Sequence, residues 1–389
     1  MLGLPKGVPL LIANSLFTSI GFYAFIPFLS IYLVDYLAWP PLLVGLLLTV
    51  RQVSQQGPTF LTGMFADRVG LKLVMCIGLV IRSVGFAMFA FVDQIATMFL
   101  AAVIAGLGGA LFGPTGSGLF AHLTPEEERV RVYSLQKAVS NIGIALSAGL
   151  GAVLIYFDFA LLSLVCGGIY LVLAIISHWY LPDVRSPIKR WSYKDMGRVV
   201  MTDRNFLLFT AIMTGIWYIY MQLYFTIPLQ LYQQTGNKMA VSLVNLVVAG
   251  VVILFQYPVV KYLTGRRPFL TSLTIGALAL GAGALMVGLS GSLAGIIIGL
   301  VFFGYGIIIV EPVQYDLTSR LANGELLATY FGFASLAIAV GGGCSQGIGG
   351  WLFQQGPALL WGSCGAVCLL VVYGLRRLGK RDNLVALGP

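Results

Sequence analysis

Long apolar runs alternate with short polar segments along this chain. A helix needs about 20 predominantly apolar residues to cross a bilayer. Charges, prolines and glycine clusters mark off twelve such runs, at 8–35, 41–66, 71–93, 95–121, 133–157, 160–181, 205–233, 239–264, 268–290, 293–320, 327–354 and 358–378. The pattern predicts an all-α polytopic membrane protein with twelve transmembrane helices.

One polar segment, 182–204, separates the first six runs from the last six, and 191–200 within it has the composition of a short amphipathic helix at a membrane surface. We therefore expect an N-terminal six-helix bundle over 1–181, a cytoplasmic linker over 182–204 and a C-terminal six-helix bundle over 205–389. An ordinary long loop at 182–204 would give nearly the same pattern.

Composition supports a bilayer as the solvent for most of the surface. Of the 389 residues, 58% are hydrophobic and only 10% are charged, whereas a soluble domain carries about 25% charged residues. The net charge of +9 does not indicate a nucleic-acid partner, because the basic residues lie in short loops between apolar runs.

The distribution of Lys and Arg predicts the topology through the positive-inside rule. With a cytoplasmic N-terminus, the outer loops contain only Lys238 beside Asp35, Asp93 and Asp158. The inner loops then contain the whole linker and most other loop cations, namely Arg68, Lys72, Arg129, Arg131, Arg266, Arg267, Arg320, Arg376, Arg377, Lys380 and Arg381. Both termini are therefore expected in the cytoplasm.

The two halves also match each other at an offset of about 198 residues. The matching pairs fall on equivalent runs and loops: Arg68 with Arg266, Pro114 with Pro312, Leu119 with Leu317, Gly149 with Gly347 and Gly151 with Gly349. Duplicated six-helix halves are typical of secondary transporters, which bind substrate between the halves near the bilayer midplane.

The loop after the second run reads G-M-F-A-D-R-V-G-L-K over 63–72. Its glycines permit a tight reversal, and its aspartate can bind a helix N-terminus or a basic side chain. The alternative is a hairpin that only carries positive-inside charge. The string resembles the signature loop of the major facilitator superfamily, from which it departs at Phe65 and Leu71. The resemblance implies that this loop holds a cytoplasmic gate, with the gating residues Gly63, Asp67, Arg68, Gly70 and Lys72 and with Asp67 against the start of the eleventh helix.

A narrower resemblance concerns the stretches 48–57, 104–114, 307–312 and 349–353. They are similar to MdtH-type multidrug resistance proteins, within the twelve-span drug:proton antiporters. The chain departs from many such antiporters by having Ala101 and Ala102 where the fourth span often carries an arginine. The fifth span also lacks the usual Gly-Pro pair, and both departures weaken the case for antiport.

Ionisable residues inside apolar runs are costly and are therefore candidates for function. Glu311, just before Pro312 in the tenth run, is the candidate for proton coupling because a carboxyl group there can alternate between a neutral and an ionised state. A structural polar residue is the alternative. Asp316 is a second candidate, although it lies nearer the inner end and is expected to be solvated.

Candidate substrate-cavity residues combine cationic, amide and aromatic side chains. Helical spacing places Arg51, Gln52 and Gln55 on one face of the second run, where they either contact substrate or fix helix packing. The remaining candidates are Arg82, Lys137, Trp217, Tyr220 and Tyr224. The aromatic residues share one face of the seventh run, although lipid-facing rings would show the same spacing.

No catalytic or metal-binding constellation is evident. The five cysteines all lie in apolar runs, and only two histidines occur, so we expect no cofactor, metal site or enzymatic activity.

The sequence favours a proton-coupled exporter of small amphipathic compounds, acting by alternating access around a central cavity. We expect it to be a monomer in the bacterial inner membrane, with a small molecule, protons and the lipid bilayer as partners. The alternative is a carrier of a defined metabolite, such as a siderophore exporter or a nutrient symporter.

Overall fold

A computed structural model describes residues 4–33, 37–39, 41–91, 94–184, 191–224, 226–235, 242–264 and 268–380. These residues are almost entirely helical and contain no β-strand, as predicted. Several residues used to predict topology lie outside this described part, namely Asp35, Asp93, Arg185, Lys189, Arg190, Lys238, Arg266, Arg267 and Arg381.

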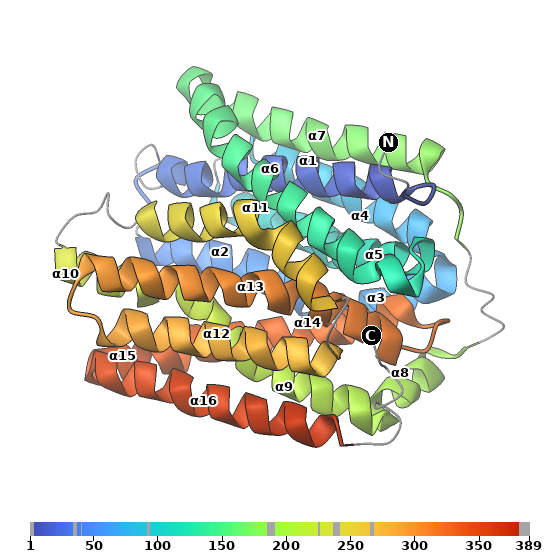
Figure 1. The fold of residues 1–389 in the computed structure, drawn as a ribbon. Coiled ribbons are helices and arrows are strands. Elements are labelled where there is room, and N and C mark those ends of the chain that lie inside the picture. The colour runs from blue at the N-terminus through green and yellow to red at the C-terminus, as the bar shows by residue number, and fades with distance from the viewer. Residues whose placement is uncertain are drawn as a thin grey trace. The chain divides into compact units, whose positions relative to one another are not determined.

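The helices follow the predicted runs (Figure 1). In the N-terminal half they are α1 (Val8–Ile31), α2 (Pro41–Gln56), α3 (Thr59–Val69), α4 (Leu71–Met88), α5 (Ile95–Leu123), the short η2 (Glu126–Glu128), α6 (Arg129–Phe157) and α7 (Phe159–Tyr180). After them come α8 (Tyr193–Thr202), α9 (Arg204–Met221), η3 (Gln222–Tyr224), α10 (Thr226–Thr235), α11 (Ser242–Thr264), α12 (Phe269–Leu289), α13 (Leu293–Leu321), α14 (Leu327–Cys344), η5 (Ser345–Gly349), α15 (Gly350–Gln355) and α16 (Pro357–Leu378).

Within the described residues, ten helical stretches are long and apolar enough to cross a membrane. The predicted second and fifth runs are helical but lie outside these ten. The second is divided into α2 and α3 at Pro58, where a proline cannot donate the backbone hydrogen bond that would continue the helix. The fifth run lies within α6 (Arg129–Phe157).

The two halves repeat one set of helix pairings. In the N-terminal half, α4 packs on α5 and α7, α2 packs on α5, and α1 packs on α7. In the C-terminal half, α12 packs on α13 and α16, α11 packs on α13, and α9 packs on α16. Figure 1 shows α12 and α13 running alongside each other.

Glycines that allow close helix packing recur at the offset found in the sequence. A Cβ atom on Gly85 would meet the backbone of Ala105, and one on Gly283, 198 residues later, would meet the backbone of Phe303. Similarly, Gly108 faces the Arg82 backbone, and Gly306 faces the Leu280 backbone in the second half. Small residues let membrane helices approach closely, and these equivalent contacts support an internal duplication.

The chain divides into two compact units, and two short segments belong with the opposite half of the sequence. The first unit consists of Met1–Val132, Val139–Val200 and Ala322–Ser335. The second consists of Tyr133–Ala138, Met201–Leu321 and Leu336–Pro389. The start of α14 therefore belongs to the first unit, and a turn of α6 belongs to the second. The main division falls inside the predicted linker, and the boundaries at 182 and 204 stay a prediction.

The glycine contacts predict a destabilising effect of one methyl group. Gly85→Ala and Gly283→Ala should each lower the melting temperature of the detergent-solubilised protein, because overpacking a close helix contact costs about 1–3 kcal/mol. Gly168→Ala is the matched control, since its Cβ atom would meet nothing within 4 Å, and it should leave the melting temperature unchanged or raised. Equal melting temperatures for all three variants would contradict the assigned packing.

Candidate functional site

The carboxylate of Asp67, near the end of α3, binds the first turn of α14. Its oxygens accept hydrogen bonds from the Ala328 amide at 3.0 Å, the Thr329 amide at 2.6 Å and the Thr329 hydroxyl at 2.7 Å. The first amides of a helix have no intrahelical acceptor and carry partial positive charge. Asp67, which is only 2% exposed, therefore caps α14, and these residues all belong to the first unit.

Two glycines of the same loop are required by its geometry. A Cβ atom on Gly63 would collide with the Ala328 backbone, so α3 and α14 could not approach as closely with any larger residue. A reciprocal contact places Gly332 of α14 against the Thr59 backbone. Gly70 begins the turn into α4 with a φ of 123°, a conformation that favours glycine.

The two cations of the loop also have partners within the first unit. The guanidinium of Arg68 lies 4.9 Å from the ring centroid of Tyr193 in α8, which is a cation–π contact. The Lys72 ammonium donates to the Leu181 carbonyl at 2.7 Å, just beyond α7. The five predicted gating residues thus lie in α3, at Gly70 and in the first turn of α4. Their role as a gate stays a prediction.

Glu311 in α13 is the centre of a buried polar cluster. Its Oε2 atom lies 2.7 Å from the Lys137 ammonium, and its Oε1 atom accepts hydrogen bonds from Lys137 at 2.9 Å and from the Tyr220 hydroxyl at 2.7 Å. Glu311 is 5% exposed and Tyr220 is 4% exposed, whereas the Lys137 side chain is 27% exposed. The second unit supplies this carboxylate and its donors from α13, from α9 and from the segment Tyr133–Ala138 of α6.

Two further aromatic rings lie near Tyr220. The ring centroid of Trp217 is 4.7 Å from that of Tyr220, and the ring centroid of Tyr224 is 6.2 Å from it. Trp217 is buried, whereas Tyr224 is 55% exposed. The predicted aromatic face therefore reaches Glu311 through Tyr220, and any substrate contact of these rings stays a prediction.

Asp316 requires a correction, because it is fully buried and not solvated as expected. Its Oδ2 atom accepts a hydrogen bond from Arg320, one helical turn later, at 2.8 Å. The Arg320 guanidinium also lies 4.6 Å from the ring centroid of Phe269. A fixed ion pair within one helix lets the aspartate be buried, and it gives Asp316 a different setting from Glu311.

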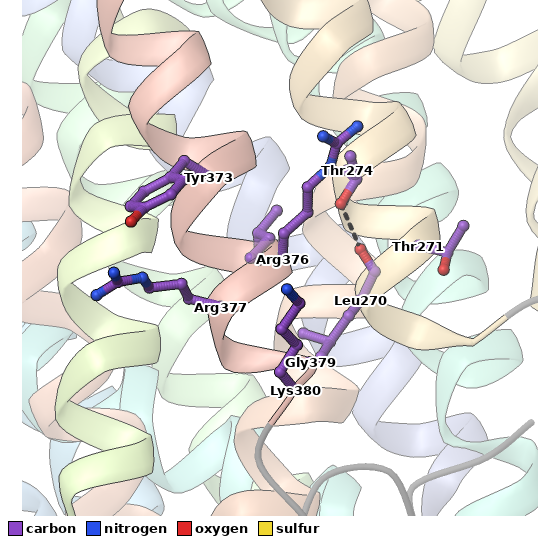
Figure 2. A pocket seen from close by; sticks show the side chains of 9 residues that line it. Leu270, Thr271, Thr274, Tyr373, Arg376, Arg377, Gly379 and Lys380 are labelled. Carbon is purple, nitrogen blue, oxygen red and sulfur yellow. Dashed lines mark hydrogen bonds between the residues drawn. The ribbon is translucent and has the colours of Figure 1, made fainter.

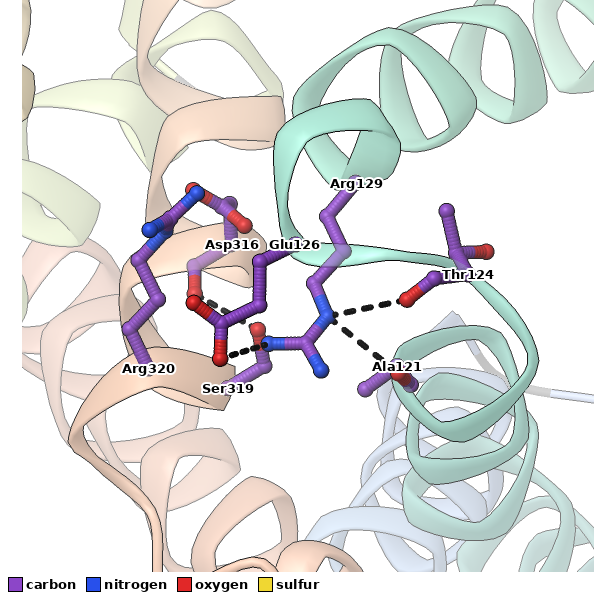
Figure 3. Close-up of polar contacts among 7 residues, drawn as sticks. All are labelled: Ala121, Thr124, Glu126, Arg129, Asp316, Ser319 and Arg320. Carbon is purple, nitrogen blue, oxygen red and sulfur yellow. Dashed lines mark hydrogen bonds and ion pairs between the residues drawn. The ribbon is translucent and has the colours of Figure 1, made fainter. Parts of the chain in front are cut away.

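Figure 3 shows this pair, and it also shows the surroundings of Arg129 in the first unit. Arg129 donates to the Ala121 and Thr124 carbonyls at 3.2 and 3.3 Å and lies 3.8 Å from Glu126. The carbonyls at the end of α5 have no partner within their own helix, so this cation stabilises the end of α5.

The predicted polar stripe of the second run forms a network within the first unit. The two Nη atoms of Arg51 donate to Gln55 Oε1 at 2.8 Å and to Gln52 Oε1 at 3.0 Å. Arg82 in α4 lies over the rings of Phe22 and Tyr170, at 5.1 and 5.0 Å from their centroids. These candidates are therefore close in space, although they come from separate helices.

A pocket of about 810 Å³ lies between α12 and the end of α16 (Figure 2). It contains no predicted cavity residue. Its lining consists of Leu270, Thr271, Thr274, Tyr373, Leu375, Arg376, Arg377, Gly379 and Lys380. Arg377 lies over the Tyr373 ring at 5.0 Å from its centroid. The three cations lie at the end of α16 that the positive-inside rule assigns to the cytoplasm.

Comparison with known proteins decides the family. The family model described as Major Facilitator Superfamily matches residues 11–346. The chain belongs to the Major Facilitator Superfamily. It is 31% identical over 370 residues to a protein of Yersinia enterocolitica named "Multidrug resistance protein MdtH", covering 94% of this chain and 92% of that protein. A protein of the same name from Proteus mirabilis is 29% identical, with 96% and 95% covered.

Solved structures of the superfamily share the fold. The E. coli fucose:proton symporter FucP matches with a TM-score of 0.80 at 14% identity, covering 96% of this chain and 98% of that one. A bacterial homologue of the iron transporter ferroportin matches with a TM-score of 0.79 at 14% identity, covering 96% and 99%. The chain is therefore a multi-pass membrane transporter with the superfamily fold, and this membership points away from an enzyme.

The superfamily resemblance inferred from the loop at 63–72 is thus confirmed, but the sequence did not pair Lys137 with Glu311. The two residues are 174 positions apart, and no periodicity relates them. Thr329 was also missed, because only the fold brings its amide and hydroxyl to Asp67. Within the described residues, no group of three or more His, Cys, Asp or Glu side chains could hold a metal ion.

The Asp67 contact predicts a local change in hydrogen exchange. Asp67→Ala should speed exchange of the Ala328 and Thr329 amides by about tenfold for each ~1.4 kcal/mol of lost stabilisation. Mass spectrometry of a peptide covering 326–331 would measure the rate. Asp195→Ala, which removes an exposed carboxylate, is the control. Unchanged exchange in Asp67→Ala would show that Asp67 does not hold α14.

Proposed function

We propose that this transporter exports small amphipathic compounds in exchange for protons, by alternating access, with Glu311 as the coupling carboxylate. The relatives named multidrug resistance proteins support the substrate class. The observation that carries the coupling proposal is the buried contact of Glu311 with Lys137 and Tyr220.

The ion pair provides a reason for proton binding to change the protein. Protonation of Glu311 removes the negative charge that the Lys137 ammonium pairs with, so the proton and the ion pair compete for one carboxylate. The Lys137 side chain is only 27% exposed, and an unpaired ammonium that is largely shielded from water is costly. Proton arrival would therefore release the α6 segment around Lys137 from α13, next to Pro312, where the helix can bend.

Asp67 would serve as the second switch in this scheme. Its hydrogen bonds hold the first turn of α14 against α3, and breaking them would free α14 to move. A ligand or proton can shift such an equilibrium only by its differential affinity for the two states. The proposal assigns proton affinity to Glu311 and the holding contact to Asp67.

The cell location and assembly belong to the same proposal. The named relatives come from bacteria, and the chain carries both halves that an MFS cavity requires. We therefore propose a monomer in the bacterial inner membrane, with both termini in the cytoplasm. The excess of Lys and Arg in the predicted inner loops supports this orientation.

Gradient-driven transport in reconstituted vesicles tests the coupling. With a panel of one cationic, one zwitterionic and one anionic aromatic dye, wild-type protein should move at least one dye in response to a proton gradient. Glu311→Gln should reduce that transport at least about tenfold, equivalent to about 1.4 kcal/mol, and Lys137→Met should do the same. Exchange of labelled for unlabelled dye without a gradient should persist in Glu311→Gln.

The control is Glu127→Gln, which neutralises an exposed carboxylate outside the cluster and should transport as the wild type does. Full gradient dependence in Glu311→Gln would contradict the coupling role. Gradient-driven uptake instead of export would favour a symporter, and no movement of any dye would favour a carrier of a defined metabolite.

A further inference from the structure

Two arginines lie buried inside the N-terminal half without a carboxylate partner. Arg51 in α2 and Arg82 in α4 are each 7% exposed. Neither forms an ion pair with any carboxylate in the described part of the chain. The Nε atom of each is buried and has no hydrogen-bond partner among the described residues. Such a pair carries two positive charges that repel each other.

The groups around both arginines are neutral. Arg51 donates to the side-chain oxygens of Gln52 and Gln55. Both guanidinium groups lie over the half-buried ring of Phe22, at 4.9 Å for Arg51 and 5.1 Å for Arg82. Amide oxygens and ring faces attract cations, but they carry no net charge. The two positive charges are therefore held in position, and no carboxylate among the described residues compensates them.

The side chains of Gln55, which accepts a hydrogen bond from Arg51, and of Arg82 both lie next to Gly109 of α5. A Cβ atom on Gly109 would lie 3.0 Å from the Gln55 side chain and 3.3 Å from the Arg82 Nη1 atom. The Arg51–Gln55 pair and the Arg82 head group are thus neighbours over one small residue. Glycine leaves the room that these polar groups occupy between the helices.

The position inside the span argues against a lipid head group as the missing charge. Arg82 lies six residues before the end of α4 (Leu71–Met88), which corresponds to about 9 Å along the helix axis. Lipid phosphates lie outside a hydrocarbon core that is about 30 Å thick. Burying charge at that depth is costly unless a counter-charge is present, so a small ligand is the suitable source.

We propose that Arg51 and Arg82 bind the anionic group of the transported compound, a carboxylate, sulfonate or phosphate on an aromatic body that packs against Phe22. Guanidinium groups suit this role because they bind oxyanions through paired N–H groups and remain charged when buried. The assignment of the ligand as a transported compound rests on the proposed function, whereas the anion site itself does not.

Binding to the purified full-length protein in detergent tests this inference with a matched pair of probes. Naphthalene-2-sulfonate carries the anion, and naphthalene-2-sulfonamide is its uncharged counterpart. Equilibrium dialysis should show the wild type binding the sulfonate at least about tenfold more tightly, or about 1.4 kcal/mol. Arg51→Gln and Arg82→Gln should each remove most of this preference. Arg131→Gln removes a positive charge from an exposed position and should keep it.

Equal affinity of the wild type for the two probes would overturn the proposal, as would a preference that survives both Arg→Gln variants. Because the aromatic body adds affinity by packing against Phe22, sulfate should compete with the sulfonate only weakly. Binding of sulfate as strong as that of the sulfonate would overturn the aromatic part of the proposal and leave a site for inorganic anions. Melting of the ligand-free variants checks folding. If Arg82→Gln does not fold, Arg82→Lys should fold and still prefer the sulfonate. Loss of that preference in folded Arg82→Lys would also contradict the site.

The two proposals fail separately. Sulfonate binding requires no proton gradient, so Glu311→Gln should retain the preference for the anion even though it loses gradient-driven transport. A preference for the sulfonate without any gradient-driven movement would remove the coupling proposal alone. Gradient-driven movement of the cationic dye alone, with no preference for the sulfonate, would remove the anion site alone.

Discussion

Burial of an ion pair among membrane helices is tolerated only when both charges are satisfied. Proposed proton coupling in this transporter depends on the pair formed by Lys137 and Glu311. The Glu311 carboxylate accepts hydrogen bonds from Lys137 of α6 and from Tyr220 of α9. Removing one partner of such a pair leaves an uncompensated charge and is strongly destabilising. Proton binding at Glu311 is a reversible way to make that change.

The two segments that join the opposite half of the sequence are the ones that carry these polar contacts. Tyr133–Ala138 contains Lys137 and belongs with α13, while Ala322–Ser335 contains Thr329 and belongs with α3. Tyr133 also stacks on Tyr315 at 5.4 Å between centroids. Each segment is thus held to the opposite half of the sequence by polar contacts that protonation of a carboxylate would change.

Sequence periodicity predicted the helices because a bilayer imposes span length directly, and the offset of 198 recurred in the packing of Gly85 and Gly283. The pattern did not predict the break at Pro58 within the second run, because whether a proline ends a helix or only bends it depends on the surrounding fold. Individual site residues could be predicted from the sequence, because an ionisable residue inside an apolar run is rare. Their partners were not, because the contact between Lys137 and Glu311 depends on tertiary packing. The solvation expected of Asp316 failed for the same reason, since the fold buries it with Arg320.

The most direct measurement is of proton release when a transported compound is added to the purified protein in weakly buffered detergent solution. Exchange of the compound for the proton bound by Glu311 predicts that adding the compound releases protons from the wild type. It also predicts that Glu311→Gln, with binding intact, releases none. Equal proton release from both proteins would contradict the central role of this ion pair.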